Sequence, residues 1–439
     1  MLKIYDYAKV DKKTIFARED SLSDVDEVVS EIIDKVRTEG DKALLEYGEK
    51  FDGAVLEDLE VGQAEIEEAF EAIDNEFLEI LKEAAGNIRE YHKMQVREGF
   101  EIRKGDGIVL GQKVTPLEKV GLYVPGGTAA YPSTVLMDSI PAKIAGCSEI
   151  VITTPPGKDG KVNPVILAAA KIAGVDRIFK VGGAQAVAAL AYGTETVPRV
   201  DKIVGPGNAF VAEAKRQVFG QASIDMIAGP SEILVIADSK SNPVFVAADL
   251  LSQAEHDKMA SAVLVTDDYD FAKAVQEEIE AQLATLPREE IARTSIEDNG
   301  KIIVASDLML AVEIANEIAP EHLELCVDDP FKYLDEVKHA GSIFMGRYCP
   351  EALGDYFAGP NHTLPTSGTA RFSSPLSVDD FVKKSQYTYY EAEALEKVAK
   401  KIAYFAGKEG LDGHGRSTTI RFQDTKGFQD GKLGAEGEA

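Results

Sequence analysis

The chain has no tryptophan, only three cysteines and only six histidines among 439 residues. Cys147, Cys326 and Cys349 form an odd and widely spaced set, so we expect neither a disulfide framework nor a zinc site built from thiolates. No apolar run approaches the length that spans a membrane, and charged residues interrupt the first ten positions, which argues against a signal sequence. We therefore expect a cytoplasmic protein with no membrane partner.

Cationic side chains are also few. The 47 Lys and Arg residues against 75 Asp and Glu residues give a formal net charge of −28. Such a charge repels a phosphate backbone, so we expect no nucleic-acid partner. A length of 439 residues exceeds what one compact core usually holds, which predicts two or more domains.

The pattern of apolar and polar residues changes near residue 120. Apolar residues at helical spacing predict helices between residues 23 and 92, and a β-hairpin is expected around residues 105–107. Beyond residue 120, short apolar strands alternate with helical segments, which is typical of mostly parallel α/β sheets. Two such sheets fit the length, a further helix is expected at 391–406, and the acidic, Gly-rich tail from 424 is expected to be disordered. Strands are expected at 149–153, 177–181, 202–204, 233–237, 262–266 and 301–304.

Three Gly-rich turns follow expected strands, at residues 124–128, 181–185 and 204–208. Loops at the carboxyl ends of parallel strands are where α/β proteins bind cofactors, and helix N-termini there attract phosphate. None of the turns has the G-x-G-x-x-G pattern, however. A tight turn followed by a helix cap, with Asn208 as the cap, explains them about as well as nucleotide binding does.

The segment 251–256 places Gln253 and His256 three residues apart in a helical pattern. Residues at that spacing share a helix face, so the two side chains could bind one metal ion. Other scarce polar residues also occur in loop-like segments: Glu321, His322, Asp355, His362 and His414. Each alone is explained by a helix cap, a turn or a solvated surface, and only their combination points to chemistry.

Eight motifs taken together resemble the histidinol dehydrogenase family. In order they are GLYVPGG at 121–127, GGAQA at 182–186, VGPGN at 204–208, GPSE at 229–232, LSQAEH at 251–256, PEHL at 320–323, GDY at 354–356 and NHTLPT at 361–366. They follow the order of that family and cover nearly the whole chain.

The resemblance implies a zinc-dependent homodimer that oxidises L-histidinol to L-histidine through an aldehyde, using two NAD, as the last steps of histidine biosynthesis. It also implies an α/β fold of two Rossmann-like domains with mostly parallel sheets, similar to aldehyde dehydrogenases, plus a small C-terminal helical extension. The expected divisions are a first α/β domain at 22–119 and 232–376 with the metal and acid/base residues, a second at 120–231 with the nucleotide loops, and an arm and dimerisation extension at 1–21 and 377–439.

The resemblance further implies a role for each matched residue. The zinc ligands would be Gln253, His256, Asp355 and His414, the last supplied by the partner subunit. Glu321 and His322 would be the acid/base pair. Substrate would contact Ser231, His362 and Glu409 together with His322 and the zinc ligands, and the nucleotide would contact Tyr123, Gln185 and Asn208. His339 stands where the family pattern has asparagine, and no role is expected for it.

These residue types suit the implied chemistry. A ligand set without thiolates leaves zinc Lewis acidic, and the metal would serve as a template for the imidazole and amine of histidinol. His322, with an ordinary pKa near neutrality, is expected to take the hydroxyl proton during the alcohol step. Glu321 is expected to activate the water that adds to the aldehyde.

Three other interpretations remain open at this stage. An aldehyde dehydrogenase would use a cysteine thiohemiacetal, for which Cys349 is the best placed of the three thiols. A zinc hydrolase would use the same polar residues, with Glu321 activating water and no nucleotide. A metal-storage or scaffold protein would not need Glu321 and His322, and the repeated Gly-rich turns favour the dehydrogenase.

Overall fold

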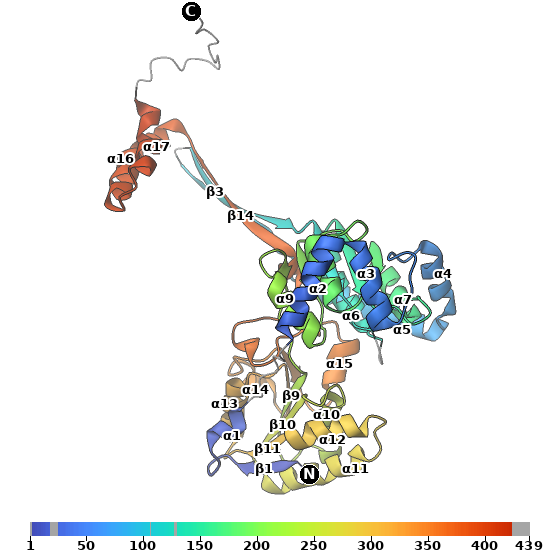
Figure 1. Cartoon of the computed structure of the whole chain (residues 1–439). Helices are drawn as coiled ribbons and strands as arrows, with labels where there is room; N and C mark the ends of the chain where they lie inside the picture. Colours follow the sequence, from blue (N-terminus) through green and yellow to red (C-terminus); the bar gives the residue numbers. More distant parts are fainter. Residues whose placement is uncertain (1, 18–24, 106, 127–129, 424–439) are drawn as a thin grey trace, which may run out of the picture. The chain divides into compact units, whose positions relative to one another are not determined.

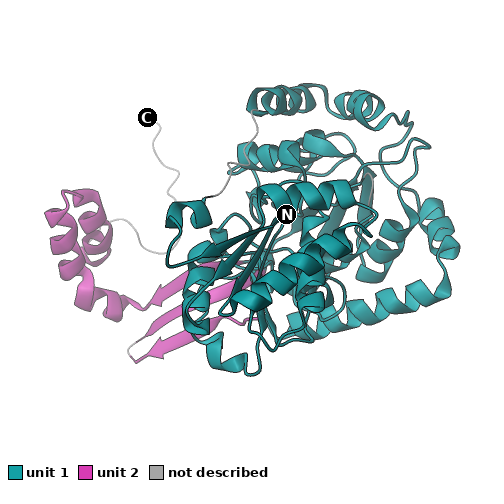
Figure 2. Cartoon of the chain, turned by 90° about the horizontal axis from the view of Figure 1, so that it is seen from below, with its two compact units in different colours: residues 1–96, 116–382 teal, residues 97–115, 383–439 magenta. Residues whose placement is uncertain are grey.

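The computed structural model describes residues 2–17, 25–105, 107–126 and 130–423. The chain forms two compact units, residues 1–96 with 116–382 and residues 97–115 with 383–439 (Figure 2). Parts of the predicted hairpin turn and of the first Gly-rich turn, together with the predicted disordered tail, lie outside the described residues.

The larger unit contains a six-stranded sheet of entirely parallel pairs, in the order β1-β11-β10-β9-β12-β13. Its strands are β1 (Lys3–Asp6), β9 (Glu232–Ala237), β10 (Ser261–Thr266), β11 (Lys301–Val304), β12 (His322–Cys326) and β13 (Ser342–Met345). Alternate residues of the strands pack into two separate cores, so helices must cover both faces. One face packs against α10 (Pro243–Ala254), α11 (Tyr269–Leu283) and α12 (Glu289–Asp298) (Figure 1), and the other against α1 (Lys12–Phe16), α13 (Leu308–Ile318) and the region of α14 (Phe331–Leu334).

A second sheet in the same unit has five parallel strands in the order β6-β5-β4-β7-β8. The strands are β4 (Lys119–Tyr123), β5 (Glu149–Thr154), β6 (Arg177–Lys180), β7 (Lys202–Val204) and β8 (Ser223–Ile224). One face packs against α2 (Asp26–Glu39), α3 (Asp41–Tyr47), α8 (Gly183–Tyr192) and α9 (Ala209–Val218), the other against α4 (Gln63–Ala72), α5 (Asn75–Lys93), α6 (Pro132–Ala145) and α7 (Pro164–Ala173). Both sheets are therefore parallel α/β sheets, as predicted from the sequence, with helices on both faces.

Two segments differ from the predicted division of the chain. The helices of residues 26–93 pack against helices that cover the five-stranded sheet, whereas residues 22–119 were expected in the domain of the metal residues. Residues 3–6, expected in an arm, form β1 of the six-stranded sheet. The apolar spacing of a helix shows that one face is buried, but it does not show which sheet that face covers. The remaining domain boundaries stay predictions.

The smaller unit contains a three-stranded sheet and two helices. Its strands β2 (Phe100–Lys104), β3 (Ile108–Pro116) and β14 (Val382–Tyr390) lie in the order β14-β3-β2, and β2 and β3 form the predicted antiparallel hairpin. The predicted late helix is α16 (Ala392–Lys408), and it packs against α17 (Asp412–Thr419). The α/β class with mostly parallel sheets and a small helical extension is thus confirmed. Every helix in the described part of the chain is too short or too polar to cross a bilayer.

Candidate functional site

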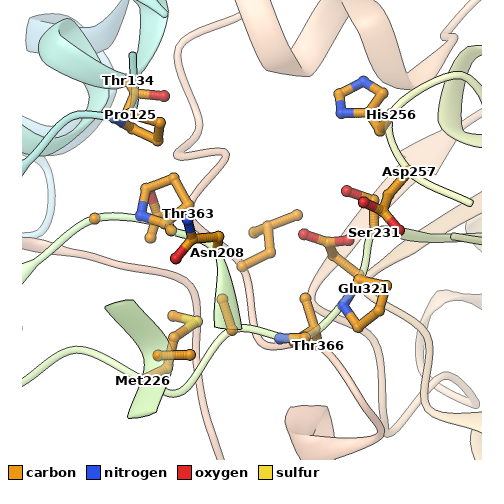
Figure 3. A pocket seen from close by; sticks show the side chains of 18 of the residues that line it. Pro125, Thr134, Asn208, Met226, Ser231, His256, Asp257, Glu321, Thr363 and Thr366 are labelled. Carbon is orange, nitrogen blue, oxygen red and sulfur yellow. The ribbon is translucent and has the colours of Figure 1, made fainter. Parts of the chain in front are cut away.

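A cavity of about 500 Å³ opens within the larger unit, where the two sheets contribute opposite walls. Figure 3 shows Thr134, Pro125 and Asn208 on one side of it and His256, Ser231 and Glu321 on the other. The first side includes the loop 205–208, which leaves the carboxyl end of β7. The second side lies at the amino ends of β9 and β12, where Ser231 precedes β9 and His322 begins β12.

Eight of the predicted site residues line this cavity: Asn208, Ser231, Gln253, His256, Glu321, His322, Asp355 and His362. They come from distant segments of the chain, since Asn208 and His362 lie 154 residues apart. The sequence therefore identified a set that the fold brings together.

Gln253 is the buried residue that most clearly calls for a ligand. Its side chain is 1% exposed, and neither Oε1 nor Nε2 has a hydrogen-bond partner among the described residues. An unsatisfied buried polar group costs about 1–3 kcal/mol, so the chain retains an amide here at a cost to its own stability. A cation or a substrate in the cavity would use the amide oxygen.

His256 lies just beyond the end of α10, in the turn that follows Gln253. The backbone N–H of His256 donates to the carbonyl of Gln253 at 3.1 Å, which keeps both residues near the end of the helix. His256 is exposed to solvent in the cavity, but partial desolvation by the surrounding protein lowers the pKa of its ring, so the imidazole is neutral and has a lone pair available for a metal. The predicted pairing of these two residues in one helical turn is thus consistent with a metal site.

His322 is held between two carboxylates. Its Nδ1–H donates to the carbonyl of Glu232 at 3.0 Å, which leaves Nε2 directed toward Asp355 Oδ1 at 3.6 Å. Burial opposes a positive charge on the ring, but the carboxylates of Glu321 and Asp355 outweigh it and raise the pKa of His322 to about 10. The Asp355 carboxylate must therefore be engaged by another group before Nε2 can serve as a base near neutrality.

For Glu321, burial is the main influence on the pKa, and it disfavours the charged form. Burial raises the pKa of Glu321 to about 8, although the backbone N–H of Glu232 donates to Oε2 at 2.9 Å and the imidazole of His322 lies 3.5 Å away. A carboxylate with a raised pKa is a stronger base once it is ionised. The position suits a group that removes a proton from water.

Both nitrogens of His362 contact the protein. Nδ1–H donates to the carbonyl of Asp355 at 3.0 Å, and the hydroxyl of Thr134 lies 3.2 Å from Nε2, which it serves as donor. Burial lowers the pKa of His362, so the ring is neutral. A contact between His362 and substrate stays a prediction.

The predicted nucleotide residues fall into two groups. Asn208 lines the cavity, and its Oδ1 accepts from the N–H groups of Phe210 and Val211 at 3.1 and 3.2 Å, so its interpretation as a helix cap is confirmed. Tyr123 and Gln185 are 5% and 2% exposed and do not line the cavity. Their contacts with a nucleotide stay predictions.

Glu409 and His414 belong to the smaller unit. Glu409 follows α16 and His414 lies in α17, and both are exposed to solvent. The four predicted zinc ligands therefore do not all belong to the unit that forms the cavity.

The sequence reasoning missed Glu351, which lies one turn before Asp355 in α15 (Glu351–Tyr356). It is 3% exposed, its Oε2 accepts from the Ser252 hydroxyl at 2.9 Å, and it forms a group with His322 and Asp355 whose potential ligand atoms lie within 4.8 Å of one another. Burial and the Asp355 charge raise the pKa of Glu351 to about 7. The spacing of two carboxylates four residues apart could have indicated it.

The cysteines are poorly placed for a thiol mechanism at this cavity. Cys147 and Cys326 are buried, and burial raises the pKa of both thiols, that of Cys147 to about 11. Cys349 is partly exposed but lines a smaller cavity of about 110 Å³, which shares Asp355, His362 and Leu364 with the larger one. A thiolate nucleophile is not available on the walls of the larger cavity in the described part of the chain.

Comparisons with known proteins agree on one family. Residues 16–422 match the family model described as histidinol dehydrogenase. The histidinol dehydrogenase of Syntrophotalea carbinolica is 59% identical over 403 residues, which are 91% of this chain and 93% of that one. The protein of the same name from Clostridium acetobutylicum is 57% identical over 401 residues, with shares of 91% and 93%. The crystal structure of histidinol dehydrogenase from Elizabethkingia anophelis matches with a TM-score of 0.92 and 38% identity, covering 96% of this chain and 98% of that one.

Replacing the unsatisfied amide of Gln253 provides a direct test of the predicted metal site. We expect Gln253→Leu to leave the metal-free protein as stable as the parent, or up to about 1–3 kcal/mol more stable, because it removes a buried group without partners. Affinity for Zn²⁺ should fall in the same variant. Calorimetric titration and thermal unfolding measure the two effects.

The matched control is Gln276→Leu, because the Gln276 amide donates to the carbonyl of Leu2. That variant should lose stability and keep its zinc affinity. A Gln253→Leu protein that binds zinc as tightly as the parent would rule out the ligand assignment.

Proposed function

The chain belongs to the histidinol dehydrogenase family, and from that premise we propose that it is a cytoplasmic enzyme that oxidises L-histidinol to L-histidine through L-histidinaldehyde. Two NAD molecules would take the two hydrides, one zinc ion per subunit would hold the substrate, and the product would be that of the last steps of histidine biosynthesis. One observation carries the proposal. A single cavity is lined by the loop 205–208 on one wall and by Gln253, His256 and Asp355 on the other.

The donor groups on this second wall fit zinc. A neutral imidazole, a carboxylate and an amide oxygen without protein partners are borderline to hard ligands, and no thiolate is among them. In the proposal, His414 of the partner subunit adds the fourth ligand. When bound, the metal would supply a Lewis acid and a fixed point for the imidazole and amine of histidinol.

The protons would be handled by two neighbouring groups of this chain. In the alcohol step a hydride leaves the carbinol carbon for NAD while the hydroxyl proton goes to Nε2 of His322, whose ring is oriented by the carbonyl of Glu232. In the aldehyde step water adds to the carbonyl carbon and Glu321 takes its proton, after which the second hydride leaves the hydrated carbon. Oε2 of Glu321 lies 3.5 Å from Nδ1 of His322, so the two groups adjoin the same part of the cavity.

The separate roles proposed for His322 and Glu321 can be tested by comparing histidinol with histidinaldehyde as the supplied substrate. We expect His322→Asn to reduce oxidation of histidinol by about a hundredfold to ten-thousandfold, the usual contribution of a positioned base, and to affect supplied histidinaldehyde less. Glu321→Gln should show its larger loss with supplied histidinaldehyde. Steady-state kcat/KM on each substrate decides, and equal losses on both substrates in both variants would contradict the assignment.

A homodimer is supported by the surface of the smaller unit. Tyr404 and Phe405 on α16 are 70% and 69% exposed, and Leu411 after it is 43% exposed. Large apolar side chains gathered on so small a unit indicate a surface that another chain covers. Together with the exposed Glu409 and His414, this supports a dimer in which each small unit completes the site of the partner subunit.

Mixing two inactive variants tests that sharing. His414→Ala and His322→Asn should each be inactive as homodimers, but half of the dimers formed by random mixing carry one site with both residues intact. Activity should therefore return to about a quarter of the parent value after joint refolding. If each subunit used its own His414, no mixture would recover activity.

The product ratio tests the reaction as a whole. Incubation of the purified protein with histidinol, NAD and zinc should form two reduced nicotinamides for each histidine, because an alcohol carbon must lose two hydrides to become a carboxylate. Absorbance of the reduced cofactor and quantification of histidine give the ratio. A ratio of one, with aldehyde accumulating, would limit the protein to alcohol oxidation, and turnover without NAD would indicate a hydrolase.

A further inference from the structure

Lys215 is a buried cation that the proposed reaction does not use. It lies on α9, is 2% exposed, and its Nζ donates to the carbonyl of Gly205 at 2.9 Å. The same ammonium group pairs with the carboxylate of Asp225, which is 1% exposed. Neither residue was singled out by the sequence motifs.

Asp225 binds the other polar group of the same glycine. It follows β8 directly, and its Oδ2 accepts from the N–H of Gly205 at 2.9 Å. One buried ion pair therefore satisfies both the N–H and the carbonyl of Gly205. Rotation of the backbone at this point would break a charge-assisted hydrogen bond to one of two buried side chains.

Gly205 has a backbone conformation with positive φ, which residues other than glycine rarely adopt. Its φ is +111°, and a Cβ added there would lie 2.2 Å from the carbonyl oxygen of Tyr123. The loop therefore runs against the end of β4 in a backbone conformation that other residues rarely adopt. Pro206 and Gly207 continue it along the cavity wall to Asn208.

Stability alone gives a weak reason for this pair. Burying two charges costs a large desolvation free energy, and replacement of such a pair by apolar residues of similar volume is often neutral or stabilising. What apolar residues cannot provide is an anchor for both backbone polar groups of Gly205, one in each of the two peptide units that flank its Cα. The placement of the pair, directly behind a loop that lines the cavity, makes positioning the better explanation.

We infer that Lys215 and Asp225 are positioning residues that hold the loop 205–208 in the conformation that a nicotinamide dinucleotide binds. The inference rests on the proposed function for the identity of the ligand. The restraint of the loop 205–208 by Lys215 and Asp225 does not depend on that function. A loop that spent a tenth of its time in the competent conformation would weaken apparent affinity about tenfold.

The test replaces both partners together, so that no unpaired charge is left in the core. In Lys215→Met with Asp225→Leu we expect the Kd of NADH, followed by its fluorescence, and the KM of NAD to rise about tenfold. Zinc content and histidinol affinity should stay at parent values. In the absence of any nucleotide, amide hydrogen exchange within residues 205–211 should be faster than in the parent.

The matched control is Lys202→Met, which removes another buried lysine at the opposite end of β7. Lys202 is 7% exposed and pairs with Asp380 at 2.9 Å, but it does not contact the loop 205–208. Its loss should lower the melting temperature and leave both NADH binding and exchange in 205–211 unchanged.

The outcomes separate the inference from the proposed function. Unchanged exchange in residues 205–211 of the double variant would overturn the inference, as would faster exchange with an unchanged Kd for NADH. Faster exchange with a parent protein that binds no NADH would support the hold on the loop and contradict the proposed cofactor.

Discussion

Burial of polar side chains without enough partners of their own is the constraint on which this site depends. Gln253 is buried with no hydrogen bond among the described residues, and His322 is buried with Nε2 unsatisfied between two carboxylates. In a folded core such groups lower stability, so their presence at one place shows that the fold stores free energy that a ligand can recover. Burial raises the pKa of Glu321, whereas the carboxylates of Glu321 and Asp355 raise that of His322 against the effect of burial.

The two sheets contribute the two walls of the cavity through opposite ends of their strands. The six-stranded sheet presents the amino ends of β9 and β12, where α10 returns with Gln253 near its end. The five-stranded sheet presents the carboxyl end of β7, the usual position of cofactor loops in parallel sheets. Because α10 runs antiparallel to the strands that it covers, its last turn and the starts of the strands meet. A reacting centre can therefore lie between a polar, ligand-rich wall and a glycine-rich loop.

The sequence was sufficient for features that local spacing encodes. The strands β5, β6, β7, β9, β10 and β11, the hairpin of β2 and β3 and the α16 helix all followed from periodicity or turn signals. The strands β1, β8, β12 and β13 were not predicted. It was not sufficient for features that depend on distant packing. Which sheet the helices of residues 26–93 cover, and the burial of Lys215 against Asp225, are decided by contacts that no local pattern records.

His339 illustrates why a departure from a family pattern need not disturb the fold. Asn316 Oδ1 accepts from the backbone N–H groups of Lys338 and His339, at 2.7 and 3.2 Å. Because that contact uses the main chain, the side chain at position 339 can change without its loss. Glu351 illustrates the converse. Its spacing from Asp355 indicates a shared helix face, but its contact with Ser252 on another helix depends on packing that neither segment records.

The segment that carries His362 explains how the two walls keep a fixed separation. Asn361 donates from Nδ2 to the carbonyl of Met137 at 2.6 Å, and the Thr363 hydroxyl donates to Asp138 at 2.7 Å. Both partners lie in α6, which covers the five-stranded sheet, whereas the segment itself follows α15 and Asp355. A hinge motion between the sheets would have to break these buried bonds, each costly to leave unmade. These bonds tie the segment that follows Asp355 to the helix α6 that covers the other sheet, so the cavity is largely preformed.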